Sequence, residues 1–231
     1  MLTLDALTLT QDDFSLTADF VVPSGARVAV IGPSGAGKST LLSAIAGFFA
    51  PTSGRVLWNG TDLTAQPPGA RPLSILFQDQ NLFPHLTVAQ NLGLGLKPNL
   101  RLTAADHAAV QTALTRTGLA GLGARKPGQL SGGQQSRVAL ARTLLRARPL
   151  LLLDEPFAAL GPALKAEMLA LVAGLAAEQG TTVLMVSHDP ADARAFAPLS
   201  ILVAEGRAHP PQPTAALLDS PPPALAAYLG S

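Results

Sequence analysis

A glycine-rich stretch near the start of the chain has the residue types and spacing of a phosphate-binding loop. It reads Gly32-Pro33-Ser34-Gly35-Ala36-Gly37-Lys38-Ser39-Thr40 and matches the pattern G-x-x-x-x-G-K-[ST]. The glycines let successive backbone N–H groups face phosphate oxygens, and a helix that starts at the lysine adds its positive end. We expect Lys38 to reach the β- and γ-phosphates of a nucleotide, and the Ser39 hydroxyl to bind Mg²⁺.

Two acidic residues, Asp154 and Glu155, follow directly on the four leucines of residues 150–153. Such an apolar run is typical of a parallel strand that is covered on both faces, and open α/β sheets bind ligands where these strands end. We expect Asp154 to hold Mg²⁺, directly or through water, and Glu155 to polarise the water that attacks the γ-phosphate. In a chain without a phosphate loop, a solvated strand end would be the simpler interpretation.

Two further polar side chains follow strand-like segments. His188 comes after residues 182–186, where its imidazole could donate a hydrogen bond to the γ-phosphate and help to orient the water. Gln78 comes after residues 73–77 and could bind Mg²⁺ or water through its side-chain carbonyl, although a plain loop residue is the alternative. No catalytic role is expected for the other histidines, which are His85, His107 and His209.

A second glycine-rich helix start, LSGGQQSRVALAR, begins at residue 130. Ser131, Gly132, Gly133 and Gln134 stand at or next to the start of a helix expected over residues 134–147, and exposed N–H groups there suit a γ-phosphate. Because the loop at residues 32–40 already serves one nucleotide, we expect this second start to bind the nucleotide of another copy, in a head-to-tail dimer with two shared sites. A helix-capping serine before a glycine turn explains the serine, but not the paired glycines.

The elements that must position these residues predict an α/β protein with a phosphate-loop core and a mostly parallel sheet. Alternation of apolar and polar residues over residues 2–9 and 14–22 predicts a small N-terminal antiparallel sheet. Alanine and leucine at helical spacing predict a helical subdomain, inserted at about residues 87–135. The other expected strands are 28–31, 150–153, 182–186 and 200–203, and the other expected helices are 38–46, 162–178 and 190–196.

Composition narrows the classes of function. The 231 residues carry a net charge of +1 with 13% charged side chains, which is no basic excess for a nucleic acid. No apolar run reaches the roughly 18 residues of a membrane-spanning helix, and the N-terminus lacks the pattern of a signal peptide. We therefore expect one domain over residues 1–231 that works in the cytosol, without nucleic acid and without a separate C-terminal regulatory domain.

In this order, GPSGAGKST, Gln78, LSGGQ, LLLLDE and Ser187-His188 resemble the ATP-binding subunits of ABC transporters over essentially the whole chain. The resemblance implies hydrolysis of ATP with Mg²⁺ by a homodimer at the cytoplasmic face of the inner membrane. It also implies two transmembrane permease subunits and an external solute-binding protein. A permease helix would dock near Gln78, on the apolar residues Phe77, Leu82, Phe83 and Pro84, which could equally be local core.

The stretches GPSGAGKSTLLSAIAGF, LFQDQNLFPHLTVAQNLGLGLKP and TVLMVSHD are most similar to bacterial import ATPases for thiamine and its phosphates. This similarity alone supports the cargo, because the ATPase does not touch it. An importer for another solute, such as iron or sulfate, would share every catalytic residue. A soluble ABC protein of translation or DNA repair is the alternative from another class, but such proteins usually carry two ATPase units or long insertions.

Two features depart from the family pattern. Gly161 stands where the family usually has the aspartate of S-A-L-D, which weakens the expected coupling between the two subunits. The aromatic residue that usually stacks on adenine is absent from LTQDD at residues 9–13. Phe14 is nearby, but its alternation with Leu16 and Phe20 favours a place in the core.

The second helix start can be tested with Ser131→Arg. A long cationic side chain at this position should leave ATP binding by a single subunit unchanged and block closure of the dimer. Equilibrium binding of ATP and sedimentation with a non-hydrolysable ATP analogue would measure the two effects. Dimer formation by the variant at wild-type level would contradict the shared site.

Overall fold

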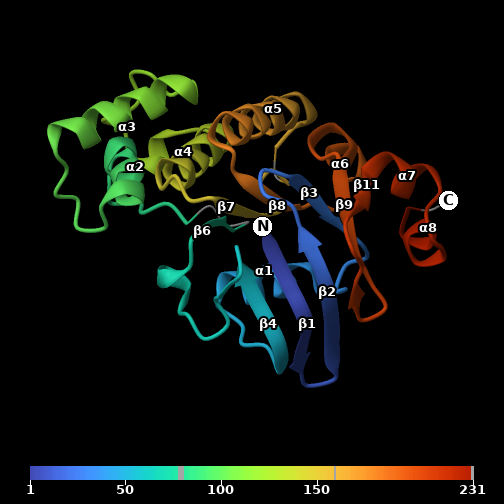
Figure 1. The fold of residues 1–231 in the computed structure, drawn as a ribbon. Coiled ribbons are helices and arrows are strands. Elements are labelled where there is room, and N and C mark those ends of the chain that lie inside the picture. Colours follow the sequence, from blue (N-terminus) through green and yellow to red (C-terminus); the bar gives the residue numbers. More distant parts are fainter. Residues whose placement is uncertain (78–80, 159, 230–231) are drawn as a thin grey trace.

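The computed structural model describes residues 1–77, 81–158 and 160–229, and Figure 1 shows their arrangement. The expected site residue Gln78 lies outside the described residues, as does Ala159. None of the helices in the described ranges has the length and apolar character needed to cross a membrane.

A single mixed sheet of eleven strands runs through the described part of the chain. Its parallel half contains β9 (Leu199–Ala204), β3 (Arg27–Ile31), β8 (Thr182–Val186), β7 (Leu150–Asp154) and β6 (Leu73–Leu76), in that order. Its antiparallel half contains β5 (Thr61–Asp62), β4 (Ser53–Trp58), β1 (Leu2–Gln11) and β2 (Phe14–Val22). The short β10 (Arg207–Ala208) joins the two halves, and β11 (Gln212–Pro213) pairs with β9.

Alternate residues of the parallel strands enter two separate apolar cores, one on each face of the sheet. Leu150 and Leu152 enter the first core, with α1 (Lys38–Ala46) and the antiparallel strands. Leu151 and Leu153 enter the second core, with α5 (Pro162–Gln179), α6 (Pro190–Phe196) and part of α4 (Gly132–Leu145). Both faces are therefore covered, which is why these strands read as unbroken apolar runs. The expected α/β core with a small antiparallel sheet is confirmed.

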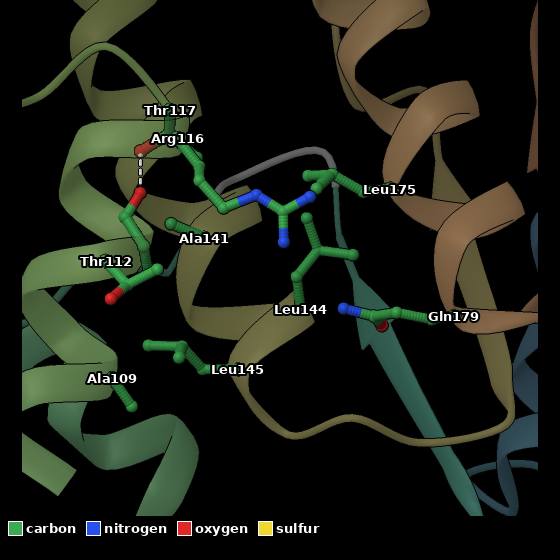
Figure 2. A pocket seen from close by; sticks show the side chains of 10 residues that line it. Ala109, Thr112, Arg116, Thr117, Ala141, Leu144, Leu145, Leu175 and Gln179 are labelled. Atoms are coloured by element: carbon green, nitrogen blue, oxygen red, sulfur yellow. Dashed lines mark hydrogen bonds between the residues drawn. The ribbon is translucent and has the colours of Figure 1, made fainter. Parts of the chain in front are cut away.

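Three helices form a group with its own apolar core, at one end of the molecule in Figure 1. This third core is built by α2 (Val88–Leu96), α3 (Ala104–Arg116) and α4. Where the group meets α5 the packing is incomplete, and a cavity of about 250 Å³ lies between α3, α4 and α5. Figure 2 shows Arg116 extending across this cavity. Arg116 also forms an ion pair with Glu178 of α5. The limits of the inserted subdomain, about residues 87–135, stay a prediction.

Most expected elements end within two residues of the observed ones, and the largest difference is in α4. This helix covers Gly132–Leu145 instead of residues 134–147, because Ser131 caps its N-terminus: the side-chain oxygen accepts from Gln134 N at 3.3 Å. The remaining helices are α7 (Thr214–Asp219) and α8 (Pro223–Leu229). Strands β4, β5, β10 and β11 have no counterpart among the expected elements, because most of them are too short to show a period.

Arg71 closes the C-terminal end of α1 from inside the protein. Its side chain is buried, and its guanidinium donates to Ala44 O at 2.9 Å and to Ile45 O at 2.8 Å. Further bonds reach Thr64 O at 3.0 Å and Gln66 O at 2.9 Å. A carbonyl at a helix end has no partner within its own helix, so Arg71 supplies what the helix lacks.

We expect Arg71→Ala to lower the free energy of unfolding by about 3 kcal/mol, because four backbone carbonyls lose a hydrogen bond from a buried guanidinium. Urea denaturation would measure this loss. Arg55→Ala is the matched control: it removes an arginine from an exposed ion pair with Asp5, which contributes less than about 1 kcal/mol. Equal losses for the two variants would show that Arg71 has no special role at the end of α1.

Candidate functional site

The loop between β3 and α1 depends on glycine at positions where no other residue fits. Gly32 has φ 148°, and a Cβ there would lie 2.0 Å from Val203 O. Gly37, the residue before α1, has φ 99°, and a Cβ there would lie 2.4 Å from the ring of Phe14. The loop backbone can therefore curl beneath the start of α1 only because these side chains are missing.

The ring of Phe14 packs against this loop at Gly37. Its ring is partly buried and packs against the first core, in agreement with its expected place. The close approach to Gly37 shows that the ring also touches the loop at the first turn of α1. Phe14 therefore supports the loop, and its packing explains why Gly37 has no substitute there.

Lys38 is the buried cation of the loop. Its side chain curls back so that Nζ donates to Gly32 O and Pro33 O, each at 2.8 Å. Burial lowers the pKa of Lys38 below its ordinary value, while the negative charges of Glu155 and Asp154 oppose that shift. A positive charge held by two carbonyl oxygens at the start of a helix is suited to bind an anion such as phosphate.

Ser39 links the loop to the end of β7. Its Oγ donates to Asp154 Oδ1 at 2.9 Å. Burial raises the pKa of Asp154, the bond from Ser39 opposes the shift, and the charge of Glu155 adds to it. The described residues contain no group of three or more His, Cys, Asp or Glu side chains that could enclose a metal. A hydroxyl and one carboxylate instead fit Mg²⁺, which keeps several waters and completes its shell with substrate phosphates.

Glu155 and His188 meet because β7 and β8 are neighbours in register. Asp154 pairs with Val186, and Glu155 N donates to Val186 O at 3.2 Å, one step beyond the ladder. Glu155 has φ 45°, a left-handed conformation that costs a non-glycine residue energy. Its Oε2 lies 3.3 Å from Nδ1 of His188, whose side chain is 53% exposed. One nitrogen of the exposed imidazole therefore faces the glutamate.

The segment that carries His188 is held by charges that the sequence does not reveal. Lys165 of α5 forms ion pairs with Asp189 at 2.7 Å and with Asp192 at 2.9 Å. The bond from Lys165 is the main cause of the lowered pKa of Asp189, and the bond to Asp189 is the main cause of the raised pKa of Lys165. We did not predict Lys165, because it lies 24 positions from Asp189 and carries no motif of its own.

The second glycine-rich start lies apart from this cluster, at the N-terminus of α4. Its paired glycines have different explanations. Gly133 packs against α5, where a Cβ would lie 2.3 Å from Leu164 Cδ2, whereas no atom comes within 4 Å of a Cβ on the exposed Gly132. Gln134 folds back, and its Oε1 accepts from Ser131 N at 3.0 Å. A Cβ at Gly133 would thus require the end of the Leu164 side chain to move, whereas no contact within the described part of the chain accounts for glycine at position 132.

Gly161 is not required by the fold. It precedes α5 with φ −65°, and a Cβ there would meet no atom within 4 Å. An aspartate would fit this position, so the departure from the family pattern is not a consequence of packing.

A phosphate loop, a hydroxyl–carboxylate pair and a glutamate–histidine pair at one edge of a parallel sheet define a nucleotide-binding α/β protein of the phosphate-loop class. Residues 16–158 match the family model described as ABC transporter. The chain therefore belongs to the ABC transporter family, and it is an ATPase of that family. The expected resemblance is confirmed.

Full-length relatives support the same assignment. The chain is 69% identical over 230 residues to the thiamine import ATP-binding protein ThiQ of Cereibacter sphaeroides, with 100% of both chains covered. It is 60% identical over 231 residues to the protein of the same name from a Ruegeria species, again with 100% of both covered. Among solved structures, it matches the dimeric cassette MJ0796 in a post-hydrolysis state with ADP and phosphate. That match has a TM-score of 0.81 and 30% identity, and it covers 93% of this chain and 99% of the other.

We expect Lys38→Ala to weaken ATP binding by about tenfold to a hundredfold, because a charge-assisted contact to the phosphates is lost. Isothermal titration of the purified chain with ATP would measure the change in Kd. Lys97→Ala is the control, since Lys97 forms an ion pair with Asp106 on the helical group. An unchanged Kd for Lys38→Ala would refute the phosphate-binding role of this lysine.

Proposed function

We propose that the chain is the ATP-hydrolysing subunit of a membrane importer for thiamine or thiamine phosphates. The observation that carries this proposal is the 69% identity, over the whole of both chains, to a thiamine import ATP-binding protein. The structure supports the catalytic part of the proposal, because the loop, Asp154, Glu155 and His188 meet at one sheet edge.

In this proposal the phosphates of ATP lie on the loop. The backbone of residues 32–40 and Lys38 bind the β- and γ-phosphates, with Thr40 on the first turn of α1 beside them. Ser39 and Asp154 would hold Mg²⁺, and Gln78 is a third proposed ligand. The ion would supply positive charge that stabilises the charge developing on the transferred phosphoryl group.

Glu155 and His188 would act on the water and the γ-phosphate. The Glu155 carboxylate accepts a hydrogen bond from the attacking water and takes its proton as the new P–O bond forms and the bond to ADP breaks. Nδ1 of His188 faces Glu155 at 3.3 Å, so Nε2 can donate to a γ-phosphate oxygen. The strained backbone of Glu155 supports this role, since such conformations cluster at functional sites.

Two copies would form the complete enzyme. The exposed start of α4, with Ser131, Gly132, Gly133 and Gln134, is proposed to bind the γ-phosphate held by the partner. The dimeric assembly of MJ0796, which has this fold, supports such an arrangement. Because Gly161 cannot replace the carboxylate of the usual aspartate, we propose weaker coupling between the two sites.

A groove of about 350 Å³ between the sheet and α2 and α4 is the proposed contact with the permease. Two of the large apolar side chains that the described surface exposes, Phe48 at 57% and Phe83 at 46%, line this groove. Phe77 lies edge-on to Phe48, with ring centroids 5.6 Å apart. The guanidinium of Arg142 lies 6.0 Å from the centre of the Phe83 ring. Exposed aromatic rings in a groove favour a helix of a partner protein.

Of the four residues expected at the permease contact, not all line the groove. Phe77 and Phe83 line the groove, and Pro84 is exposed beside it. Leu82 instead packs against both the second and the third cores, so its position fits local core, which was the alternative. Phe48 was not expected, because it lies in the turn after α1, far from the others in sequence.

The complete importer in this proposal has two copies of this chain bound to two permease subunits. They would lie at the cytoplasmic face of the membrane, and an external solute-binding protein would deliver the cargo. The import function in the names of the full-length relatives supports this assembly.

Uptake of labelled thiamine by a strain that lacks the gene tests the proposal. Wild-type protein should restore uptake, whereas Glu155→Gln should bind ATP, accumulate as a closed dimer and leave uptake at background, because its amide cannot accept the proton of the water. Glu167→Gln, a change on the exposed face of α5, is the matched control and should restore uptake. Normal thiamine uptake in the deletion strain would overturn the cargo, and wild-type hydrolysis by Glu155→Gln would overturn the catalytic assignment.

A further inference from the structure

The last helix of the described chain reaches the segment that carries His188. The hydroxyl of Tyr228 on α8 donates to the backbone oxygen of His188 at 2.5 Å, across 40 positions of sequence. Neither residue belongs to a motif that would have suggested the contact. The bond therefore comes from the way in which the end of the chain folds back over the sheet edge.

Helix α8 is fixed in place by apolar packing. Leu225 is fully buried in the second core together with Leu217 of α7, and Tyr228 packs against the same core with its ring partly buried. The three prolines of residues 221–223 precede this part of the chain and limit its backbone freedom. The Tyr228 hydroxyl thus belongs to a part of the protein that is tied to the sheet.

The neighbours of His188 are held by other elements. Ser187 Oγ donates to Asp192 Oδ2 at 3.0 Å, and Asp189 accepts from Lys165 at 2.7 Å and caps α6. His188 lies between them, with its imidazole at Glu155 and its backbone oxygen at Tyr228. The bond from Tyr228 therefore restrains the backbone of the one residue of the three whose side chain faces the glutamate.

We propose that Tyr228 is a positioning residue for ATP hydrolysis, which holds the His188 peptide so that the imidazole stays beside Glu155. The inference rests on the proposed role of His188. It assigns to α8 a function in the site, through the contact of Tyr228 with the backbone of His188.

The hydroxyl keeps its proton at neutral pH, so it remains a donor. Burial raises the pKa of Tyr228 above its ordinary value of 10.0, and the nearby negative charges of Glu155 and Asp189 raise it further. Both carboxylates oppose a phenolate at this position. The hydroxyl can therefore donate this hydrogen bond at neutral pH.

The test is a double-mutant cycle with Tyr228→Phe and His188→Ala in the full-length protein. Tyr228→Phe keeps the ring in the core and removes only the hydroxyl. We expect kcat for ATP hydrolysis to fall about threefold to tenfold with an unchanged KM for ATP, as the loss of one hydrogen bond that orients a catalytic group predicts. In the His188→Ala background, removal of the same hydroxyl should have no further effect, because no imidazole remains to be positioned.

A second measurement does not depend on activity. Hydrogen exchange followed by mass spectrometry should show faster exchange of the amides of residues 187–189 in Tyr228→Phe, because their restraint is lost. Ala227→Ser changes an exposed residue of the same helix and is the control for both readouts. Urea unfolding midpoints equal to that of the wild type would show that the fold is intact.

The outcomes separate this inference from the function on which it rests. If His188→Ala hydrolyses ATP at the wild-type rate, the proposed role of His188 is wrong. If His188→Ala is impaired while Tyr228→Phe has the wild-type kcat and wild-type exchange, the role of Tyr228 is wrong and that of His188 stands. An equal loss from Tyr228→Phe in both backgrounds would show that the hydroxyl acts on stability or on another group.

Discussion

The site depends on the parallel pairing of β7 with β8. This pairing brings Asp154 and Glu155, at the end of β7, to the same edge of the sheet as His188, which follows β8. Asp154 stands opposite Val186 in the register, so that Glu155 follows one residue beyond this pair and His188 two residues beyond it. A shift of one residue in either strand would turn alternate leucines from one core to the other and move the acids away from the loop. The apolar packing on both faces opposes such a shift.

Burial of charge is the cost of this arrangement. Lys38 and Asp154 both have pKa values moved by burial toward their neutral forms. The local contacts oppose those shifts: the two carboxylates favour the charged lysine, and the bond from Ser39 favours the charged aspartate. The phosphates of a nucleotide would add negative charge next to Lys38, and a divalent cation would add positive charge next to Asp154. The site is therefore arranged for an anionic ligand such as a nucleotide.

The helical group and the sheet have separate apolar cores that share α4. The N-terminus of this helix carries the second glycine-rich start, its middle packs into the second and third cores, and Arg142 near its end lies over Phe83 in the groove. Motion of the helical group would therefore move both the start of α4 and the groove.

Local pattern was sufficient for the elements whose residues interact mainly with their neighbours in sequence. The phosphate loop, the strand of four leucines and the extent of β8 could be predicted, because glycine spacing and apolar runs have a direct local cause. Contacts between distant residues could not be predicted, since Lys165 with Asp189, Tyr228 with His188 and Phe48 in the groove are separated by long stretches of chain. Packing also showed that a side chain at Gly133 would meet the end of the Leu164 side chain, whereas a side chain at Gly161 would start in open space. The sequence by itself determined the chemistry available to this protein and the class of fold that carries it. Only the tertiary structure decided which side chains restrain the reactive ones, because the pairing of strands and the docking of helices depend on the chain as a whole.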